Sequence, residues 1–202
     1  MENFIEIISK LSLSAIAGYL FGSIPLAYQI SKRKGINIFK TGTGLAGASN
    51  VLHSVGKKPA AIVFWGDFLK GFSSILFSTM IGIQGQWLII PALTSIMGHW
   101  NSIFTKFKGG DGMVTLGGAT IGAFPIIGLT SITTASILTL LLRVIPYMTL
   151  IGFAIGGLML FILNMIYFSN INLAIGYFLL YILVIIHALR GHRKRINFFE
   201  SI

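Results

Sequence analysis

The feature that most restricts how this chain can fold is a series of long apolar stretches separated by short polar segments. The stretches fall near residues 5–31, 59–82, 86–105, 113–126, 127–142, 147–167 and 171–189. A helix needs about 20 apolar residues to cross the hydrocarbon core of a membrane. With 54% hydrophobic and 10% charged residues, a soluble domain could not cover so much apolar surface. The sequence therefore predicts an all-α integral membrane protein with a single membrane domain over residues 1–202.

The fourth and fifth stretches are each short for a membrane span, but together they are long for one helix. Phe124-Pro125 lies between them, and proline removes an intrahelical hydrogen bond and favours a break. We therefore expect two short helices here and about seven transmembrane helices in all, with five or six as alternatives. The patterns Gly117-Gly118 with Gly122 and Gly152 with Gly156-Gly157 predict close packing between helices.

The basic residues gather in alternate polar segments, which sets the expected orientation. One segment holds Lys32, Arg33, Lys34, Lys40, Lys57 and Lys58, a second holds Lys106 and Lys108, and the tail holds Arg190, Arg193, Lys194 and Arg195. By the positive-inside rule these segments face the cytoplasm. We expect the N-terminus outside, the C-terminus in the cytoplasm, and cytoplasmic loops near 32–58, 105–112, 143–146 and 190–202. The net charge of +10 is then topological and attracts membrane lipids, and we expect no nucleic-acid partner.

Two of these segments are rich in glycine and hydroxyl side chains, at residues 35–56 and 106–112. Free backbone N–H groups and short hydroxyl side chains are what phosphate binding requires. Two such loops at the edge of a membrane domain indicate an enzyme that acts on a charged headgroup beside lipid tails. An ordinary cytoplasmic turn has a similar composition, so that interpretation stays open for the first loop.

Charged and ionisable residues inside the apolar stretches form a second set of candidates. Asp67 and Lys70 are three apart on one helix face, so we expect a structural ion pair that either braces a substrate pocket or only orients the helix. His99, which lies between Gly98 and Trp100, is typical of an anchor at the membrane interface.

Several common kinds of catalytic site are missing from the sequence. The chain has no cysteine, which excludes thiolate nucleophiles and thiolate metal sites. It contains no metal-ligand spacing, no Walker A loop and no Gly-x-Ser-x-Gly elbow. We therefore expect neither a metal nor a cofactor.

A series of short motifs in fixed order resembles a known family, the bacterial acyl-phosphate-dependent glycerol-3-phosphate acyltransferases. The motifs are Gly22-Ser23-Ile24-Pro25, Gly42-Thr43-Gly44, Gly47-Ala48-Ser49-Asn50-Val51, Asp67-x-x-Lys70-Gly71, Gly98-His99, Phe107-Lys108-Gly109-Gly110-Asp111-Gly112 and His192-Arg193. Each motif alone is weak, but their order and spacing cover nearly the whole chain and are specific together.

The resemblance implies a reaction in which glycerol 3-phosphate attacks an acyl phosphate to give lysophosphatidate for phospholipid synthesis. It implies a multi-pass protein of the bacterial cytoplasmic (inner) membrane with its active site facing the cytoplasm. The implied catalytic residues are Thr43, Lys108 and His192. The implied substrate-binding residues are Gly42, Gly44, Gly47, Ser49, Asn50, His53, Gly109, Gly110 and Arg195.

The chain departs from the family pattern at several motif positions. Asn37 and Phe39 replace an aspartate and an arginine, Leu45 replaces an asparagine, His53 an arginine, Asp111 a lysine and Arg195 an asparagine. Exchanging a lysine for an aspartate changes the local charge by two units and repels phosphate. These changes leave two alternatives to the family reaction: a divergent paralogue with another polar acceptor or no activity, and a small membrane transporter or scaffold.

Overall fold

The computed structural model describes residues 2–141, 148–167 and 170–200, and over residues 190–200 it describes the course of the helix. Within these ranges the chain forms nine α-helices and three short 3₁₀ helices. The α-helices are α1 (Glu2–Ser23), α2 (Leu26–Arg33), α3 (Ala48–Ser54), α4 (Lys57–Met80), α5 (Ile89–Trp100), α6 (Met113–Ala123), α7 (Pro125–Leu141), α8 (Met148–Tyr167) and α9 (Ile171–Glu200). The 3₁₀ helices are η1 (Ile38–Lys40), η2 (Gly85–Leu88) and η3 (Ile103–Thr105).

The outer surface of the helices is apolar, as a lipid environment requires. Large side chains such as Phe4, Trp65, Leu140 and Ile166 are exposed, and lipid solvates such a surface where water would not. In the described part of the chain, the helical stretches long and apolar enough to cross a membrane are Phe4–Arg33, Lys57–Met80, Thr149–Tyr167 and Ile171–Leu189. The expected all-helical membrane architecture is confirmed, whereas the count of seven crossings stays a prediction.

Two prolines shape the helices, one as expected and one not. The predicted break at Phe124-Pro125 is confirmed, because α6 ends at Ala123 and α7 begins at Pro125. The first stretch, expected to be continuous over 5–31, is also divided, since α1 ends at Ser23 and α2 begins at Leu26. Pro25 lacks an N–H and disfavours helical geometry in the preceding residue, which accounts for this break.

Two segments expected as loops contain helix. α3 forms within the first glycine-rich segment, directly after Gly47. The tail expected from residue 190 continues α9 as far as Glu200, and its lysines and arginines are good helix formers. The side chains of His192 and Arg195 lie outside the described residues, as does the expected loop at 143–146.

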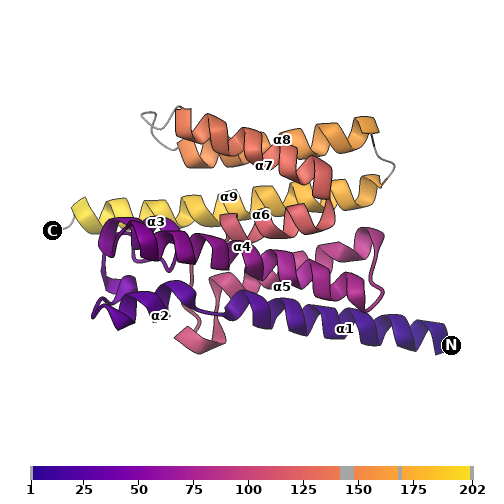
Figure 1. Ribbon diagram of the computed structural model, residues 1–202, viewed down its shortest axis with the longest axis horizontal. Helices are drawn as coiled ribbons and strands as arrows, with labels where there is room; N and C mark the ends of the chain where they lie inside the picture. The colour runs from indigo at the N-terminus through magenta and orange to yellow at the C-terminus, as the bar shows by residue number, and fades with distance from the viewer. Residues whose placement is uncertain (1, 142–147, 168–169, 201–202) are drawn as a thin grey trace.

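The helices lie side by side, and the polar connections of interest gather at one end of the bundle. Figure 1 shows α2, α3 and the C-terminal end of α9 at that end, while the N-terminus lies at the opposite end. The main hydrophobic core includes Ile75, Ile96, Leu116 and Tyr177 and lies between α4, α5, α6 and α9. A smaller core, formed by Ala27, Ile38, Ala46, Val51, Ala60 and Val63, holds α2, η1 and α3 against α4.

Glycines bring α4 and α6 into close contact. A Cβ atom added at Gly71 would collide with the carbonyl oxygen of Thr115, and one at Gly118 would collide with that of Phe68. The helix packing predicted from Gly117-Gly118 is thus confirmed. The same close approach places the charged face of α4 directly against Thr115 of α6.

Candidate active site

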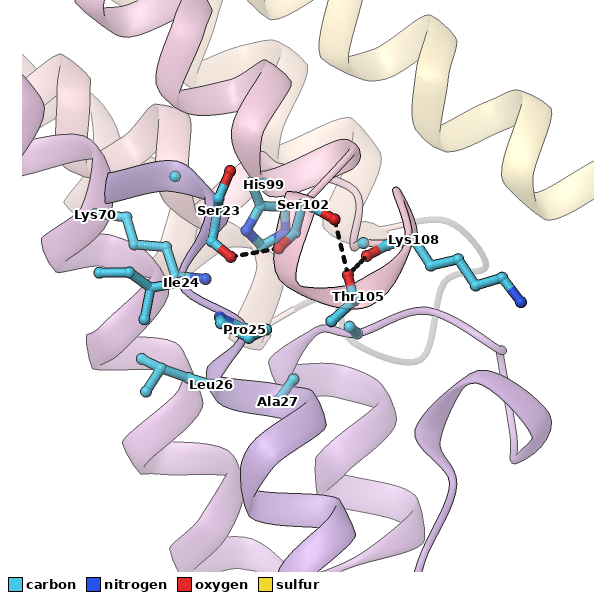
Figure 2. A pocket seen from close by; sticks show the side chains of 13 residues that line it. Ser23, Ile24, Pro25, Leu26, Ala27, Lys70, His99, Ser102, Thr105 and Lys108 are labelled. Carbon is cyan, nitrogen blue, oxygen red and sulfur yellow. Dashed lines mark hydrogen bonds between the residues drawn. The ribbon is translucent and has the colours of Figure 1, made fainter. Parts of the chain in front are cut away.

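The two glycine-rich loops meet at one end of the bundle. The backbone N–H of Ala46 in the first loop donates a hydrogen bond of 3.1 Å to the carbonyl oxygen of Gly109 in the second. Beside this junction is a narrow cleft (Figure 2). Its lining comes from the α1–α2 break, both loops, α4 and the end of α5, and comprises Gly22, Ser23, Ile24, Pro25, Leu26, Ala27, Ala46, Lys70, His99, Ser102, Thr105, Lys108 and Gly109.

Asn50 organises the first loop from within. Its side chain is 2% exposed, and its Nδ2 donates to the carbonyl oxygens of Ile38, Thr41 and Leu45 at 3.1, 3.0 and 2.9 Å. Its Oδ1 accepts from the backbone N–H of Thr43 at 3.2 Å and from the Ser54 hydroxyl at 3.1 Å. The amide is therefore occupied by the loop itself.

The other candidates of the first loop surround this amide. Gly42 and Gly44 have φ of +55° and +66°, a left-handed conformation that glycine adopts without steric cost. Thr43 is half-buried between them, and Ser49 and His53 are exposed on α3. The cleft itself is lined from this loop by Ala46, so these polar side chains lie around the cleft and not within its lining.

The second loop is a tight backbone structure that depends on its glycines. The N–H of Gly110 donates to the carbonyl oxygen of His99 at 3.2 Å. A Cβ atom at Gly109 would collide with that same carbonyl, and one at Gly110 would collide with the His99 ring. Lys106 and Phe107 have φ of 55° and 59°, a left-handed geometry that is unusual for residues with side chains. The glycine motif thus fits the loop against α5.

Lys108 contributes its backbone to the cleft but not its charge. Its carbonyl oxygen accepts a hydrogen bond from the Thr105 hydroxyl, while its side chain is exposed. Figure 2 shows the ammonium group pointing away from the other labelled residues. A phosphate held by Lys108 would therefore sit outside the narrow part of the cleft.

Asp111, one of the expected departures from the motif pattern, has a local structural partner. Its Oδ1 accepts from the backbone N–H of Met113 at 3.1 Å, in the first turn of α6. Its carbonyl oxygen accepts from Trp100 Nε1 at 2.7 Å, and the Trp100 ring stacks on His187 of α9 at a centroid distance of 4.1 Å. This carboxylate stabilises the start of α6, and the indole ties the loop to α9.

Asp67, Lys70, His99 and Thr115 form a buried polar cluster beneath the cleft. Lys70 Nζ lies 2.6 Å from Asp67 Oδ1, and the two side chains are 5% and 3% exposed. His99 Nδ1 lies 3.1 Å from Thr115 Oγ1 and 3.7 Å from Asp67 Oδ1. The expectation that His99 is an interfacial anchor is wrong, because the close contact of α5 with the second loop buries its ring. The Asp-x-x-Lys spacing indicated the ion pair, but no local pattern in the sequence indicated that His99 and Thr115 would join it.

The remaining predicted site residues belong to α9. The side chains of His192 and Arg195 are outside the description, but the C-terminal end of α9 lies at the same end of the bundle as α2 and α3 (Figure 1). The predicted site segments therefore gather at one end of the molecule.

A second cavity, an apolar groove of about 420 Å³, lies between α4, α6, α7, α8 and α9. It is lined by Phe64, Phe68, Met113, Val114, Gly117, Ile132, Ala135, Ser136, Thr139, Leu140, Thr149, Phe153, Gly156 and Tyr181. Met113 directly follows Gly112, the last residue of the second glycine loop. The groove thus begins beside that loop and has a size that ligand sites commonly have.

Comparison with known proteins gives a consistent result. The family model described as Glycerol-3-phosphate acyltransferase matches residues 12–198. The chain is 34% identical to glycerol-3-phosphate acyltransferase 1 of Deinococcus radiodurans over 151 residues, which cover 75% of this chain and 76% of that protein. It is 38% identical over 116 residues to the glycerol-3-phosphate acyltransferase of Thermosipho melanesiensis, with 57% of each covered.

Solved structures agree with the sequence relatives. The crystal structure of PlsY, an integral membrane glycerol 3-phosphate acyltransferase, in its glycerol 3-phosphate form matches with a TM-score of 0.77 and 29% identity, over 95% of this chain and 92% of that one. Its lysophosphatidic acid form matches with a TM-score of 0.74 over the same shares. The chain belongs to the glycerol-3-phosphate acyltransferase family of the PlsY type.

Proposed function

We propose that this protein transfers a fatty acyl group from an acyl phosphate to glycerol 3-phosphate and releases lysophosphatidate. Membership of the family indicates glycerol 3-phosphate as the acceptor and lysophosphatidate as the product. The observation that carries the proposal is the meeting of two glycine-rich loops at one end of a lipid-facing bundle, joined by the Ala46–Gly109 hydrogen bond. An apolar groove begins beside the same junction, so a polar headgroup and a fatty chain have adjacent places.

An acyl phosphate is a mixed anhydride and is already activated. The acceptor hydroxyl oxygen bonds to the acyl carbon, the anhydride C–O bond breaks, and phosphate leaves with that electron pair. The hydroxyl proton passes to the released phosphate or to solvent. Positioning and charge stabilisation suffice for such a step without a covalent enzyme intermediate, which suits a chain without cysteine.

We assign the substrate site to the residues expected from the family motifs. Thr43, Lys108 and His192 are the proposed catalytic residues, and the proposed binding residues are Gly42, Gly44, Gly47, Ser49, Asn50, His53, Gly109, Gly110 and Arg195. Because the Asn50 side chain already makes five hydrogen bonds within the loop, its role is to shape the site. The exposed ammonium of Lys108 is placed to meet a phosphate at the mouth of the cleft.

The acyl chain occupies the apolar groove in this proposal. The groove opens between helices whose other faces are lipid-exposed, so a donor can enter from the bilayer. The lining residues that carry hydroxyls are Ser136, Thr139, Thr149 and Tyr181. A chain held there would present its carbonyl at the end of the groove nearest Met113.

The membrane arrangement completes the proposal. Seven crossings place the N-terminus outside and the C-terminal end of α9, with the glycine loops, in the cytoplasm of a bacterial cell. α5, α6 and α7, with 12, 11 and 17 residues, are the short members of the set. This orientation gives the site access to a water-soluble acceptor made in the cytoplasm.

Rescue of a bacterial strain that lacks its own glycerol-3-phosphate acyltransferase tests the function in the cell. We expect the wild-type chain to restore growth without added phospholipid precursor. Thr43→Val, which replaces the hydroxyl with a methyl group, should lower the turnover of the enzyme by about tenfold or more. Growth no better than that of the empty-vector control, although the protein is present in the membrane, would contradict the proposal.

A further inference from the structure

Of the basic side chains that the structure describes around the cleft, Lys70 is the one whose charge points into it. Figure 2 shows its ammonium group between Ile24, Pro25 and His99, whereas the ammonium of Lys108 points away. Lys70 comes from the middle of α4, and its side chain is 5% exposed. An ammonium group buried this deeply needs hydrogen-bond acceptors for its N–H donors.

Asp67 satisfies only part of the ammonium group. Lys70 has three N–H donors, and within the described residues its hydrogen bond is the one to Asp67 Oδ1, at 2.6 Å. His99 Nδ1 lies 3.7 Å from that same Oδ1 and is itself held by Thr115, so the ring packs beside the ion pair. Asp67 therefore holds the Lys70 side chain in place and leaves N–H donors directed at the cleft.

The free space in front of this ammonium matches one oxygen atom of a phosphate. The cleft has about 10 Å³ of free volume, close to the least that holds one water molecule. Ser102 and Thr105 also line the cleft, and their hydroxyls donate to the carbonyl oxygens of Ser23 and Lys108. A whole phosphate does not fit in the narrow part, but a phosphate at the mouth can direct one oxygen inward.

We infer that Lys70 is a substrate-binding residue whose Nζ donates a hydrogen bond to one phosphate oxygen at the floor of the cleft, with Asp67 as its positioning residue. This inference rests on the proposed function for the identity of the phosphate, which belongs either to glycerol 3-phosphate or to the acyl phosphate. The bond is charge-assisted and desolvated, and such bonds are among the stronger ones in proteins.

A double substitution separates this role from a merely structural one. Lys70→Met alone leaves Asp67 as an unpaired buried charge, which destabilises a protein strongly. The variant D67N/K70M removes both charges together, and D67L/K70M replaces the pair by apolar side chains in case the first variant does not fold. K10M is the matched control, because Lys10 pairs with Glu6 on the exposed face of α1, with 40% of its side chain exposed.

The measurements are KM for glycerol 3-phosphate, KM for palmitoyl phosphate, and thermal stabilisation of the purified full chain by inorganic phosphate and by glycerol 3-phosphate. We expect the folded double variant to show about a tenfold or larger rise in one KM and to lose stabilisation by phosphate. The substrate whose KM rises is the one that Lys70 binds. K10M keeps both wild-type KM values.

Wild-type KM values and wild-type phosphate stabilisation in a folded double variant would overturn the inference and leave the proposed function intact. In another outcome, the wild type makes no lysophosphatidate, but phosphate stabilises the wild type and does not stabilise the double variant. The proposed reaction would then be wrong, and the inference that Lys70 binds phosphate would be supported. A raised KM in Lys70→Met alone that returns to the wild-type value in the double variant would assign the pair a purely structural role and would also overturn the inference.

Discussion

At the scale of single residues, Asn50 shows how a motif amide can act on a site without facing it. The sequence places Asn50 among glycines and hydroxyls, a composition that favours a ligand contact. In the structure its five hydrogen bonds all stay within the first loop and α3. The loop is therefore shaped by a buried side chain, and its exposed members are free to meet substrate.

Removing this amide should unfold the loop locally. Asn50→Ala leaves the carbonyls of Ile38, Thr41 and Leu45, which are buried or partly buried, without their donor, so we expect a loss of about 3 kcal/mol in stability. Thermal unfolding in detergent, with limited proteolysis of the loop, measures this loss. The neighbouring Ser49→Ala, at an exposed position on α3, is the control and should unfold like the wild type. Equal unfolding temperatures for the two variants would contradict the assigned role.

How far the sequence predicts the site differs from residue to residue. The spacing of Asp67 and Lys70 placed both on one helix face, because helical periodicity is local. The burial of His99 could not be predicted, since it depends on where residues 105–112 return against the end of α5. The outward direction of Lys108 is equally a tertiary property, set by the left-handed backbone at Lys106 and Phe107.

At the scale of elements, the contact between α4 and α6 fixes the floor of the site. Gly71 and Gly118 let the two backbones approach, and Thr115 of α6 then contacts His99, the ring beside Asp67. Sequence predicted most helices, since apolar length and proline are local signals. It did not predict the α1–α2 break or the extent of α9, because proline is tolerated near helix ends and basic residues are equally common in loops and helices.

Two adjacent glycines of α6 should respond differently to the same methyl group. Gly118→Ala collides with the carbonyl of Phe68, so we expect a loss of about 1–3 kcal/mol from overpacking. At Gly117 the nearest atom to an added Cβ is Ile132 Cδ1, at 3.7 Å, which is an ordinary contact. Thermal unfolding of Gly117→Ala should therefore match the wild type, and equal destabilisation of both variants would show that α4 and α6 are not packed in this way.

The groove between α4 and α8 makes a prediction about acyl-chain length. Ala135→Phe places a ring into the groove lining and shortens the space for a chain. We expect the ratio of kcat/KM for octanoyl phosphate to that for palmitoyl phosphate to rise by about tenfold, since each buried methylene contributes about 0.8 kcal/mol. Parallel assays with the two donors measure this ratio, and an unchanged ratio would place the acyl chain elsewhere.

At the scale of the whole molecule, the basic segments and the candidate site lie at the same end of the bundle. The basic segments, the glycine loops and the end of α9 lie together (Figure 1), while the connection between α4 and α5 lies at the N-terminal end. In the proposed orientation, the polar substrate and the charged loops lie on the cytoplasmic side and the apolar groove faces the bilayer, so one enzyme has access to both reactants.

The absence of cysteine makes this orientation directly measurable. Single substitutions Ser49→Cys and Gln84→Cys both fall at exposed positions, one on α3 and one between α4 and α5. In intact spheroplasts we expect a membrane-impermeant thiol reagent to label the second and to label the first only after lysis. Labelling of both from outside, or the reverse pattern, would contradict the proposed topology.

Acyl transfer from acyl phosphate to glycerol 3-phosphate can be followed with purified protein in lipid nanodiscs. Palmitoyl phosphate and radiolabelled glycerol 3-phosphate are supplied, and labelled lysophosphatidate is separated from the acceptor. We expect labelled product that grows with time and with enzyme concentration, together with one phosphate released per acyl group transferred. No labelled product, while an active relative works in the same nanodiscs, would contradict the proposed function.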